Sequence, residues 1–182
     1  MKTSIQIFGI WALLLWGAGQ PVYGRAAAPR NQQAPAQSNQ AQRELLRRQA
    51  NGIFDRERQR ARDGDCDTAA TNAAIAQCLT QRIAITDLNL KTYESALRGL
   101  LALQPVGAAG PAPQDGSSTS PVAQFDQMER EWHAYLATAT AAAGRQFGDD
   151  SGGPSTGMMT HLQLVRGHMK ELDSIYYALL HL

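Results

Sequence analysis

The chain has 182 residues and a formal net charge of +1 at pH 7, from 17 Lys and Arg against 16 Asp and Glu. A charge this close to zero gives no general attraction for nucleic acid or for an anionic membrane, so we expect neither partner. The length suits one modest domain with extensions. Of all residues 43% are hydrophobic, but many of these are alanine, which predicts a thin core.

The N-terminus has the pattern of an export signal. Lys2 gives a positive start, and residues 5–18 form an apolar run that is short for a membrane span. Small residues within 22–24 predict cleavage before Arg25. Residues 1–24 are therefore a predicted signal peptide, and the mature protein is expected to be periplasmic or secreted, without a stable membrane anchor. An uncleaved anchor is the alternative that this pattern leaves open.

Two segments of different composition follow the signal. Residues 25–42 are rich in alanine, proline, glutamine and asparagine without an apolar period, which predicts a disordered, flexible linker. Residues 43–65 are densely charged, and we predict a basic helix with a short apolar edge, open to interruption at Asn51-Gly52. The large apolar residues of this edge are Leu45, Leu46, Ile53 and Phe54.

The charges are unevenly distributed along the chain. Residues 25–65 hold nine Arg against five acids, which is +4, whereas residues 66–182 hold seven Lys or Arg against eleven acids, which is −4. A basic arm ahead of an acidic body could bind its own domain or an anionic polymer. The same charges also fit a solvated helix that keeps the chain soluble.

Residues 66–103 carry the most regular apolar pattern of the chain. Its members are spaced alternately four and three residues apart, and side chains at these spacings share one face of a helix. Thr68 or Thr71 could cap the start of this helix, and Pro105 with Gly107 would end it. The members are Leu79, Ile83, Thr86, Leu90, Tyr93, Leu97 and Leu100.

Two further stripes with the same spacing follow, separated by segments of loop composition at 104–121 and 148–157. The first stripe is Phe125, Met128, Trp132, Tyr135, Ala139 and Ala142, and the second is Met158, Leu162, Val165, Met169, Leu172, Tyr176 and Leu179. Three helices of this kind, joined by loops, predict an all-α fold. We expect a small antiparallel bundle of three main helices, preceded by the charged helix and the flexible linker.

The two cysteines, Cys66 and Cys78, lie twelve residues apart. On one continuous helix their Cα atoms would be roughly 18 Å apart, whereas a disulfide needs about 7 Å or less. If they bond, Cys66 must lie outside the helix, on a segment folded back onto its first turns. Export to an oxidising compartment favours this disulfide over the alternative of two reduced, buried thiols.

An ordered set of short motifs resembles the LprI-type lysozyme inhibitor family, whose domain occurs in many exported bacterial proteins. The set is Cys66 and Cys78, then Asp87, Asn89 and Tyr93, then Glu131-Trp132 and Tyr135, then Gly152-Gly153, and last Glu171-Leu172. The resemblance covers about residues 66–175. It implies a helical domain over 66–182 in a protein of the bacterial envelope.

The chain departs from this family pattern at several positions. Leu136 and Ala137 stand where the family has arginine and aspartate. The family's third and fourth cysteines fall near Thr140 and Thr160, so this chain lacks both together, as expected when a disulfide is lost as a unit.

Several polar and aromatic residues of the pattern have two interpretations. Asp87 and Asn89 are poor helix formers in the middle of a long helix. They form either a polar contact surface or bonds to a neighbouring helix near Trp132 or Tyr135, and the resemblance favours a structural role. Trp132 and Tyr93 fall on apolar stripes, which indicates core positions.

The segment 148–157 is the predicted recognition site. Lysozyme clefts hold acidic catalytic groups on basic proteins, so an acidic body with a protruding polar loop would suit an inhibitor. A plain flexible connection also fits. The residues proposed for partner binding are Asp149, Asp150, Ser151, Gly152, Gly153 and Ser155.

Catalytic and metal-binding patterns are not recognisable in the sequence. Three histidines, His133, His161 and His168, could in principle hold zinc, but their spacing matches no known metal signature. The cysteines are not in a C-x-x-C arrangement. We therefore expect a non-enzymatic protein without cofactor or metal.

Together these observations predict an exported protein that resembles lysozyme inhibitors and blocks a lysozyme cleft with the 148–157 loop. The alternative is a structural or accessory envelope protein that binds another protein or an anionic polymer through its basic arm.

Overall fold

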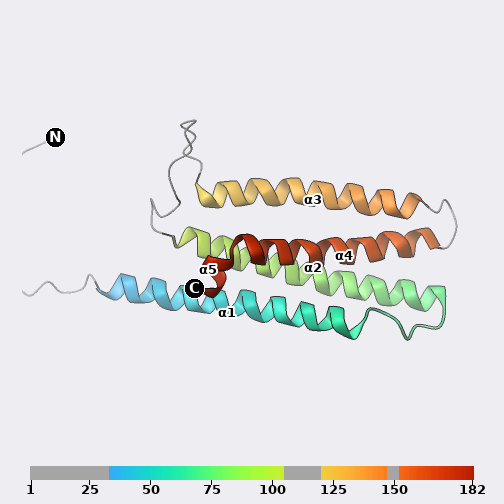
Figure 1. Cartoon of the computed structure of the whole chain (residues 1–182), viewed down its shortest axis with the longest axis horizontal. Coiled ribbons are helices and arrows are strands. Elements are labelled where there is room, and N and C mark those ends of the chain that lie inside the picture. Colours follow the sequence, from blue (N-terminus) through green and yellow to red (C-terminus); the bar gives the residue numbers. More distant parts are fainter. Residues whose placement is uncertain (1–32, 105–119, 147–151) are drawn as a thin grey trace, which may run out of the picture. The chain divides into compact units, whose positions relative to one another are not determined.

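A computed structural model describes residues 33–104, 120–146 and 152–182 (Figure 1). The predicted signal peptide, residues 25–32 of the predicted linker, and Asp149, Asp150 and Ser151 of the predicted recognition loop lie outside the described residues. None of the helices in the described ranges combines the length and the apolar character needed to cross a membrane.

The described chain is all-α, with four main helices packed antiparallel and no strand in these ranges. This confirms the predicted fold class, with the charged helix as the fourth member of the bundle. The helices are α1 (Gln33–Asp63), α2 (Asn72–Ala102), α3 (Pro121–Arg145), α4 (Gly152–Ile175) and the short α5 (Tyr177–His181).

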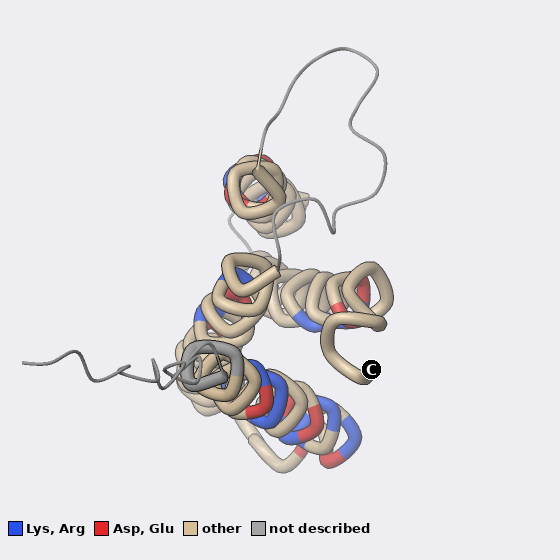
Figure 2. The backbone as a smooth tube through the Cα atoms, turned by 90° about the vertical axis from the view of Figure 1, so that its left-hand side faces the viewer, with Lys and Arg blue, Asp and Glu red and all other residues tan. Residues whose placement is uncertain are grey.

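The helices are arranged around a central pair. Viewed along the bundle in Figure 2, α2 and α4 lie between α3 at the top and α1 at the bottom. The short α5 folds back onto α1 and α4. Because α3 packs mainly on α4, its contact with α2 is looser, and a groove is left between α2 and α3.

Helix α1 begins at Gln33, ten residues before the predicted start at Arg43. The prediction of a linker over 33–42 was wrong, because alanine and glutamine have high helix propensity and can extend a helix that is packed further along. The pair Asn51-Gly52 does not interrupt the helix. Instead, Asn51 Nδ2 donates a hydrogen bond of 3.3 Å to the Leu180 carbonyl of α5.

Helix α1 is part of the bundle rather than an arm outside it, and residues 33–182 form one compact unit. Ile53 and Phe54 are buried, and the Phe54 ring stacks on Tyr93 of α2 with centroids 6.0 Å apart. Leu46 packs tightly against Gly99 of α2, because a Cβ added to Gly99 would lie 2.9 Å from Leu46 Cδ1. The structure therefore does not separate a basic arm from a 66–182 domain.

The predicted stripes form most of the core. Helix α2 begins with a hydrogen bond from the Ala74 amide to the Thr71 side chain, one of the two predicted caps. On α3, Leu136 is buried and Tyr135 is 57% exposed, so the prediction of Tyr135 as a stripe member was wrong. A step of three residues from Trp132 leads to Tyr135 and a step of four leads to Leu136, and both steps fit one helix face. Only the position of α4 decides which of the two side chains is buried. The buried stripe residues of α2 and α4 are Leu79, Thr86, Leu90, Tyr93, Leu97, Leu100, Leu162, Val165, Met169 and Leu172.

Candidate functional site

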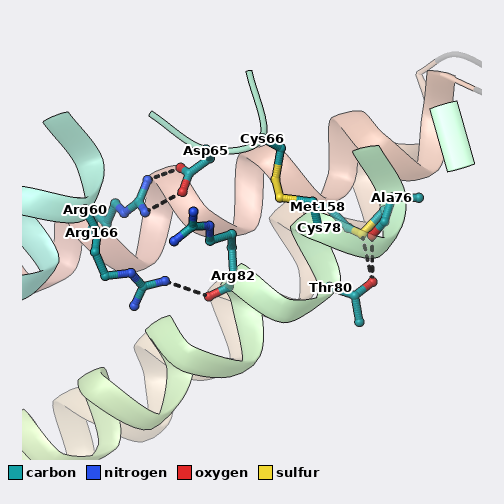
Figure 3. Close-up of a disulfide and its surroundings, with 9 residues drawn as sticks. All are labelled: Arg60, Asp65, Cys66, Ala76, Cys78, Thr80, Arg82, Met158 and Arg166. Carbon is teal, nitrogen blue, oxygen red and sulfur yellow. Dashed lines mark hydrogen bonds and ion pairs between the residues drawn. A yellow bond between two sulfur atoms is a disulfide. The ribbon is translucent and has the colours of Figure 1, made fainter. Parts of the chain in front are cut away.

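The disulfide predicted between Cys66 and Cys78 is formed, with Cα atoms 5.8 Å apart (Figure 3). Cys66 lies in the segment between α1 and α2, which folds back so that the cysteine reaches the second turn of α2. This turn requires positive φ angles of 83° at Gly64 and 67° at Cys66. The disulfide thus closes the connection between the first two helices.

A buried carboxylate, Glu57 of α1, lies next to this connection with its side chain 3% exposed. Its Oε1 accepts hydrogen bonds from Thr86 Oγ1 at 2.8 Å and from Arg166 Nε at 2.9 Å. Its Oε2 accepts from Asn89 Nδ2 at 2.8 Å and from Arg60 Nη1 at 3.0 Å. One carboxylate therefore joins α1, α2 and α4.

The pKa of Glu57 follows from these contacts. Burial alone would raise it, but the hydrogen bonds from Asn89, Thr86 and Arg166 and the nearby charge of Arg60 lower it below its usual value. Arg166 also pairs with Asp65 beside the disulfide (Figure 3), and this pair lowers the pKa of Asp65. Since both oxygens of Glu57 already accept two hydrogen bonds, this network fits a structural role.

The residues of the family-like pattern mostly lie between helices. Asp87 Oδ1 of α2 is 2.7 Å from His161 Nε2 of α4, and Asn89 bonds to Glu57 of α1. We expected their partners near Trp132 or Tyr135, but helical spacing does not specify the neighbouring helix. Tyr93 is fully buried in the core.

Part of the predicted recognition segment is helical, so the loop conformation predicted for residues 152–157 was wrong. Gly152, Gly153 and Ser155 lie in the first turn of α4. Gly157 packs on α3, where a Cβ would be 3.2 Å from the Thr140 carbonyl oxygen. Glycine allows this backbone contact because it has no side chain.

A second polar cluster lies between α2 and α3 and was not predicted. The potential metal-ligating atoms of Glu94, Glu129 and His133 all lie within 4.8 Å of one another. His133 Nε2 is 3.3 Å from Glu94 Oε1. Behind them, His168 Nε2 of α4 lies 3.0 Å and 3.2 Å from the two carboxylate oxygens of Glu129. We call Glu94, Glu129 and His133 the carboxylate–histidine cluster.

This cluster is less well satisfied than the Glu57 network. The side chains of Glu94 and Glu129 are 16% and 9% exposed. Within the described residues, Oε1 of Glu94 is buried and has no hydrogen-bond partner. Burial and the neighbouring Glu129 carboxyl raise the pKa of Glu94 to about 8. Two carboxylates this close therefore need a shared proton or a cation.

The cluster opens to solvent through the groove between α2 and α3. One part of the groove holds about 390 Å³ and a neighbouring part about 480 Å³, and Glu94 and His133 line both. Half of the His133 side-chain surface is exposed. A small ligand can thus reach the carboxylates through this groove.

The sequence offered a partial signal for this cluster. Of the three histidines considered for zinc, only His133 belongs to it, because His161 pairs with Asp87 and His168 lies behind Glu129. The spacing of Glu129 and His133, at i and i+4, would place both on one helical face. That Glu94 of another helix faces them follows only from the packing.

Comparisons of this chain with protein-family models, with curated proteins and with solved structures found no match. The fold and sites define a disulfide-linked, antiparallel helical bundle with two polar clusters. The hydrogen bonds of the Glu57 network are satisfied, whereas the carboxylate–histidine cluster has a buried acceptor without a hydrogen bond.

Proposed function

We propose that this chain is an exported, non-enzymatic protein of the bacterial envelope that blocks a lysozyme cleft, as its resemblance to LprI-type inhibitors implies. The observation that best supports this proposal is the close approach of α3 and α4 at the end of the bundle where the sequence containing Asp149 and Asp150 connects them. The blocking element is then the end of a helical hairpin rather than a long loop.

Glycines bring the two helices together at this end. A Cβ on Gly157 would lie 3.4 Å from Gly144 Cα, and a Cβ on Gly144 would lie 3.5 Å from the Gly153 carbonyl oxygen. Helices in backbone contact make a narrower end than helices separated by large side chains. A narrow end joined by the acidic sequence Asp149-Asp150 is suited to a cleft on a basic enzyme, where opposite charge also speeds the encounter.

The test is lysozyme turnover of cell walls in the presence of increasing amounts of the purified chain, with its disulfide intact. We expect inhibition at near-stoichiometric amounts. The double variant Asp149→Asn/Asp150→Asn should need about tenfold more protein for the same inhibition, because the steering charge is lost. Asp55→Asn, which changes a 74% exposed side chain on α1, is the matched control. Full turnover by animal-type and bacterial-type lysozymes alike would overturn the proposal.

A second candidate is contact with an anionic polymer through the outward face of α1. Four exposed arginines lie on this helix, namely Arg48, Arg56, Arg58 and Arg62, with the acids Asp55 and Asp63 among them. Figure 2 shows α1 as the helix at the bottom, densely marked with charged positions. The other three arginines of α1 hold the bundle together. Arg43 donates to the Leu103 carbonyl, Arg47 to the Leu179 carbonyl and Arg60 to buried Glu57. Of the exposed four, Arg58 and Arg62 contact Asp55 and Gln59 of α1 itself.

Charge reversal of the four exposed arginines separates the two candidates. It should abolish salt-dependent binding to an anionic polysaccharide such as dextran sulfate and leave lysozyme inhibition unchanged. Arg47 and Arg60 are kept because their replacement would disturb the bundle itself. Polymer binding that survives the reversal would rule out the α1 candidate.

A further inference from the structure

We propose that the carboxylate–histidine cluster, Glu94, Glu129 and His133, binds one divalent transition-metal ion of the zinc class in the groove between α2 and α3. His168 acts as the group that orients Glu129. This inference does not depend on lysozyme inhibition, and it extends to residues outside the family-like pattern.

The donor set and its spacing fit such an ion. Two carboxylate oxygens and one imidazole nitrogen are ordinary zinc ligands, with bonds of about 2.0–2.2 Å. Ligands around a tetrahedral ion of this size lie roughly 3.4 Å apart. The donor atoms already lie within 4.8 Å of one another, and one pair, Glu94 Oε1 and His133 Nε2, is at 3.3 Å. Small side-chain rotations would complete the set.

A second observation points to a missing partner. Oε1 of Glu94 is buried, and His133 Nε2, 3.3 Å away, is not placed to donate a hydrogen bond to it, nor is any other described group. A buried acceptor without a well-aligned hydrogen bond is costly, and a second carboxylate beside it adds repulsion. A cation placed between Glu94 and Glu129 would remove both penalties.

The surroundings of Glu129 resemble the outer shell of a metal site. His168 Nε2 contacts both oxygens of Glu129, and the His168 ring is stacked on Trp132 with centroids 3.9 Å apart and planes 9° apart. The stacked ring cannot turn freely, so it holds the carboxylate in one orientation. Outer groups that orient a ligand in this way typically change metal affinity by 10- to 100-fold.

The cluster also leaves room for exchangeable ligands. Three protein donors leave at least one coordination position, and the groove of about 390 Å³ supplies access for water. The imidazole donor favours zinc, iron, nickel or copper over calcium and magnesium, which prefer oxygen ligands.

The experiment is calorimetric titration of the purified, tag-free, chelator-treated full chain with Zn²⁺ at pH 7.5, with Ca²⁺ as the comparison ion. Co²⁺ absorption then reports whether nitrogen and oxygen ligands surround the ion. We expect one ion per chain, preference for Zn²⁺ over Ca²⁺, and at least tenfold weaker binding in Glu94→Gln and in His133→Asn. Neither variant removes a core contact, because Gln keeps the size of Glu94 and His133 is half exposed.

Matched controls separate this site from adventitious binding. Glu131→Gln changes an exposed carboxylate on the same helix, and His181→Asn changes a histidine that pairs with Asp173 on the surface. Both should bind Zn²⁺ as the unmodified chain does. The absence of saturable binding, or equal affinity in Glu94→Gln, His133→Asn and the controls, would overturn the proposal. Trp132 fluorescence that changes with Zn²⁺ only while His168 is present would support the orienting role.

Discussion

Glu57 and Glu94 are carboxylates on helix faces that point into the bundle, but their pKa values move in opposite directions. Glu57 accepts four hydrogen bonds, two of them from arginines, and its pKa is lowered. Glu94 faces another carboxyl, and its pKa is raised to about 8. Burial is common to both residues, so the neighbouring groups decide whether the charged form is favoured.

Replacing Glu57 by Ala should strongly destabilise the bundle. The substitution leaves the buried hydroxyl of Thr86 and the half-buried amide of Asn89 without their acceptor, and Arg166 keeps only Asp65. Removing one partner of a buried ion pair costs about 3–5 kcal/mol in the free energy of unfolding. Urea denaturation followed by circular dichroism measures this loss. Asp55→Ala, on the exposed side of the same helix, should change stability by less than about 0.5 kcal/mol. A similarly small effect of Glu57→Ala would show that the network is dispensable.

The raised pKa of Glu94 predicts a specific pH dependence of stability in chelator-containing buffer. Below the unfolded pKa of 4.5, Glu94 is protonated in both states and costs nothing. As pH rises from 4.5 to about 8, the unfolded chain ionises first, so the folded state loses stability.

Glu94→Gln should remove this loss, because the amide carries no charge and can donate to Glu129. The melting temperatures of this variant and the unmodified chain should diverge above pH 5. At pH 8 the variant should be more stable by about 1 kcal/mol or more. Parallel pH profiles for the two chains, as expected for the control Glu131→Gln, would contradict the assignment.

At the scale of helices, α4 contains glycines in opposite environments. Gly157 faces α3, where an added Cβ would lie 3.2 Å from the Thr140 carbonyl oxygen, whereas an added Cβ on the exposed Gly167 would have no atom within 4 Å. The first glycine therefore sets the distance between two helices. The second only lowers the helix propensity of α4.

Alanine substitutions at these two glycines should have different effects. Gly167→Ala should stabilise the protein by about 0.5–1 kcal/mol, which is the gain in helix propensity. Gly157→Ala gains the same propensity but must push the backbone of α3 away, so it should be less stable than Gly167→Ala by about 1 kcal/mol or more. Thermal unfolding of both variants tests this difference. Equal stabilisation would mean that α3 and α4 adjust freely at this point.

At the scale of the molecule, α1 completes the core of the other helices. It contributes Ile53 and Phe54 to the core and Glu57 to the polar network. The disulfide holds its end close to α2. The charged helix is thus needed for the domain that we first expected over residues 66–182.

A chain that starts at residue 66 should therefore fail to fold, while residues 33–182 should fold cooperatively. Without α1, the apolar face of α2, which includes Tyr93, would be exposed to water, and Arg166 would lose Glu57. Circular dichroism and urea unfolding of the two fragments distinguish these outcomes. A cooperative transition in the fragment 66–182 would show that the later helices form an independent domain.

Much of the fold could be predicted because it depends on local patterns. The alternation of three- and four-residue spacings placed α2, α3 and most of α4, and the cysteine spacing required a folded-back segment before α2. The polar start of α1 and the glycine-rich start of α4 were missed, since both lack an apolar period. The start of α1 is helical because it continues the packed part of the same helix. The start of α4 is helical where it lies in contact with α3.

The sequence by itself determined the all-α class and the main helical stripes, and it fixed where Cys66 must lie if it bonds to Cys78, because helical periodicity and the reach of a cysteine pair act between residues close in the chain. Only the tertiary structure decided which polar groups meet. Glu57 joins Arg166 across 109 residues, and Glu94 of α2 faces Glu129 and His133 of α3. Such pairs depend on the rotation and neighbours of whole helices, and periodicity within one helix does not specify either.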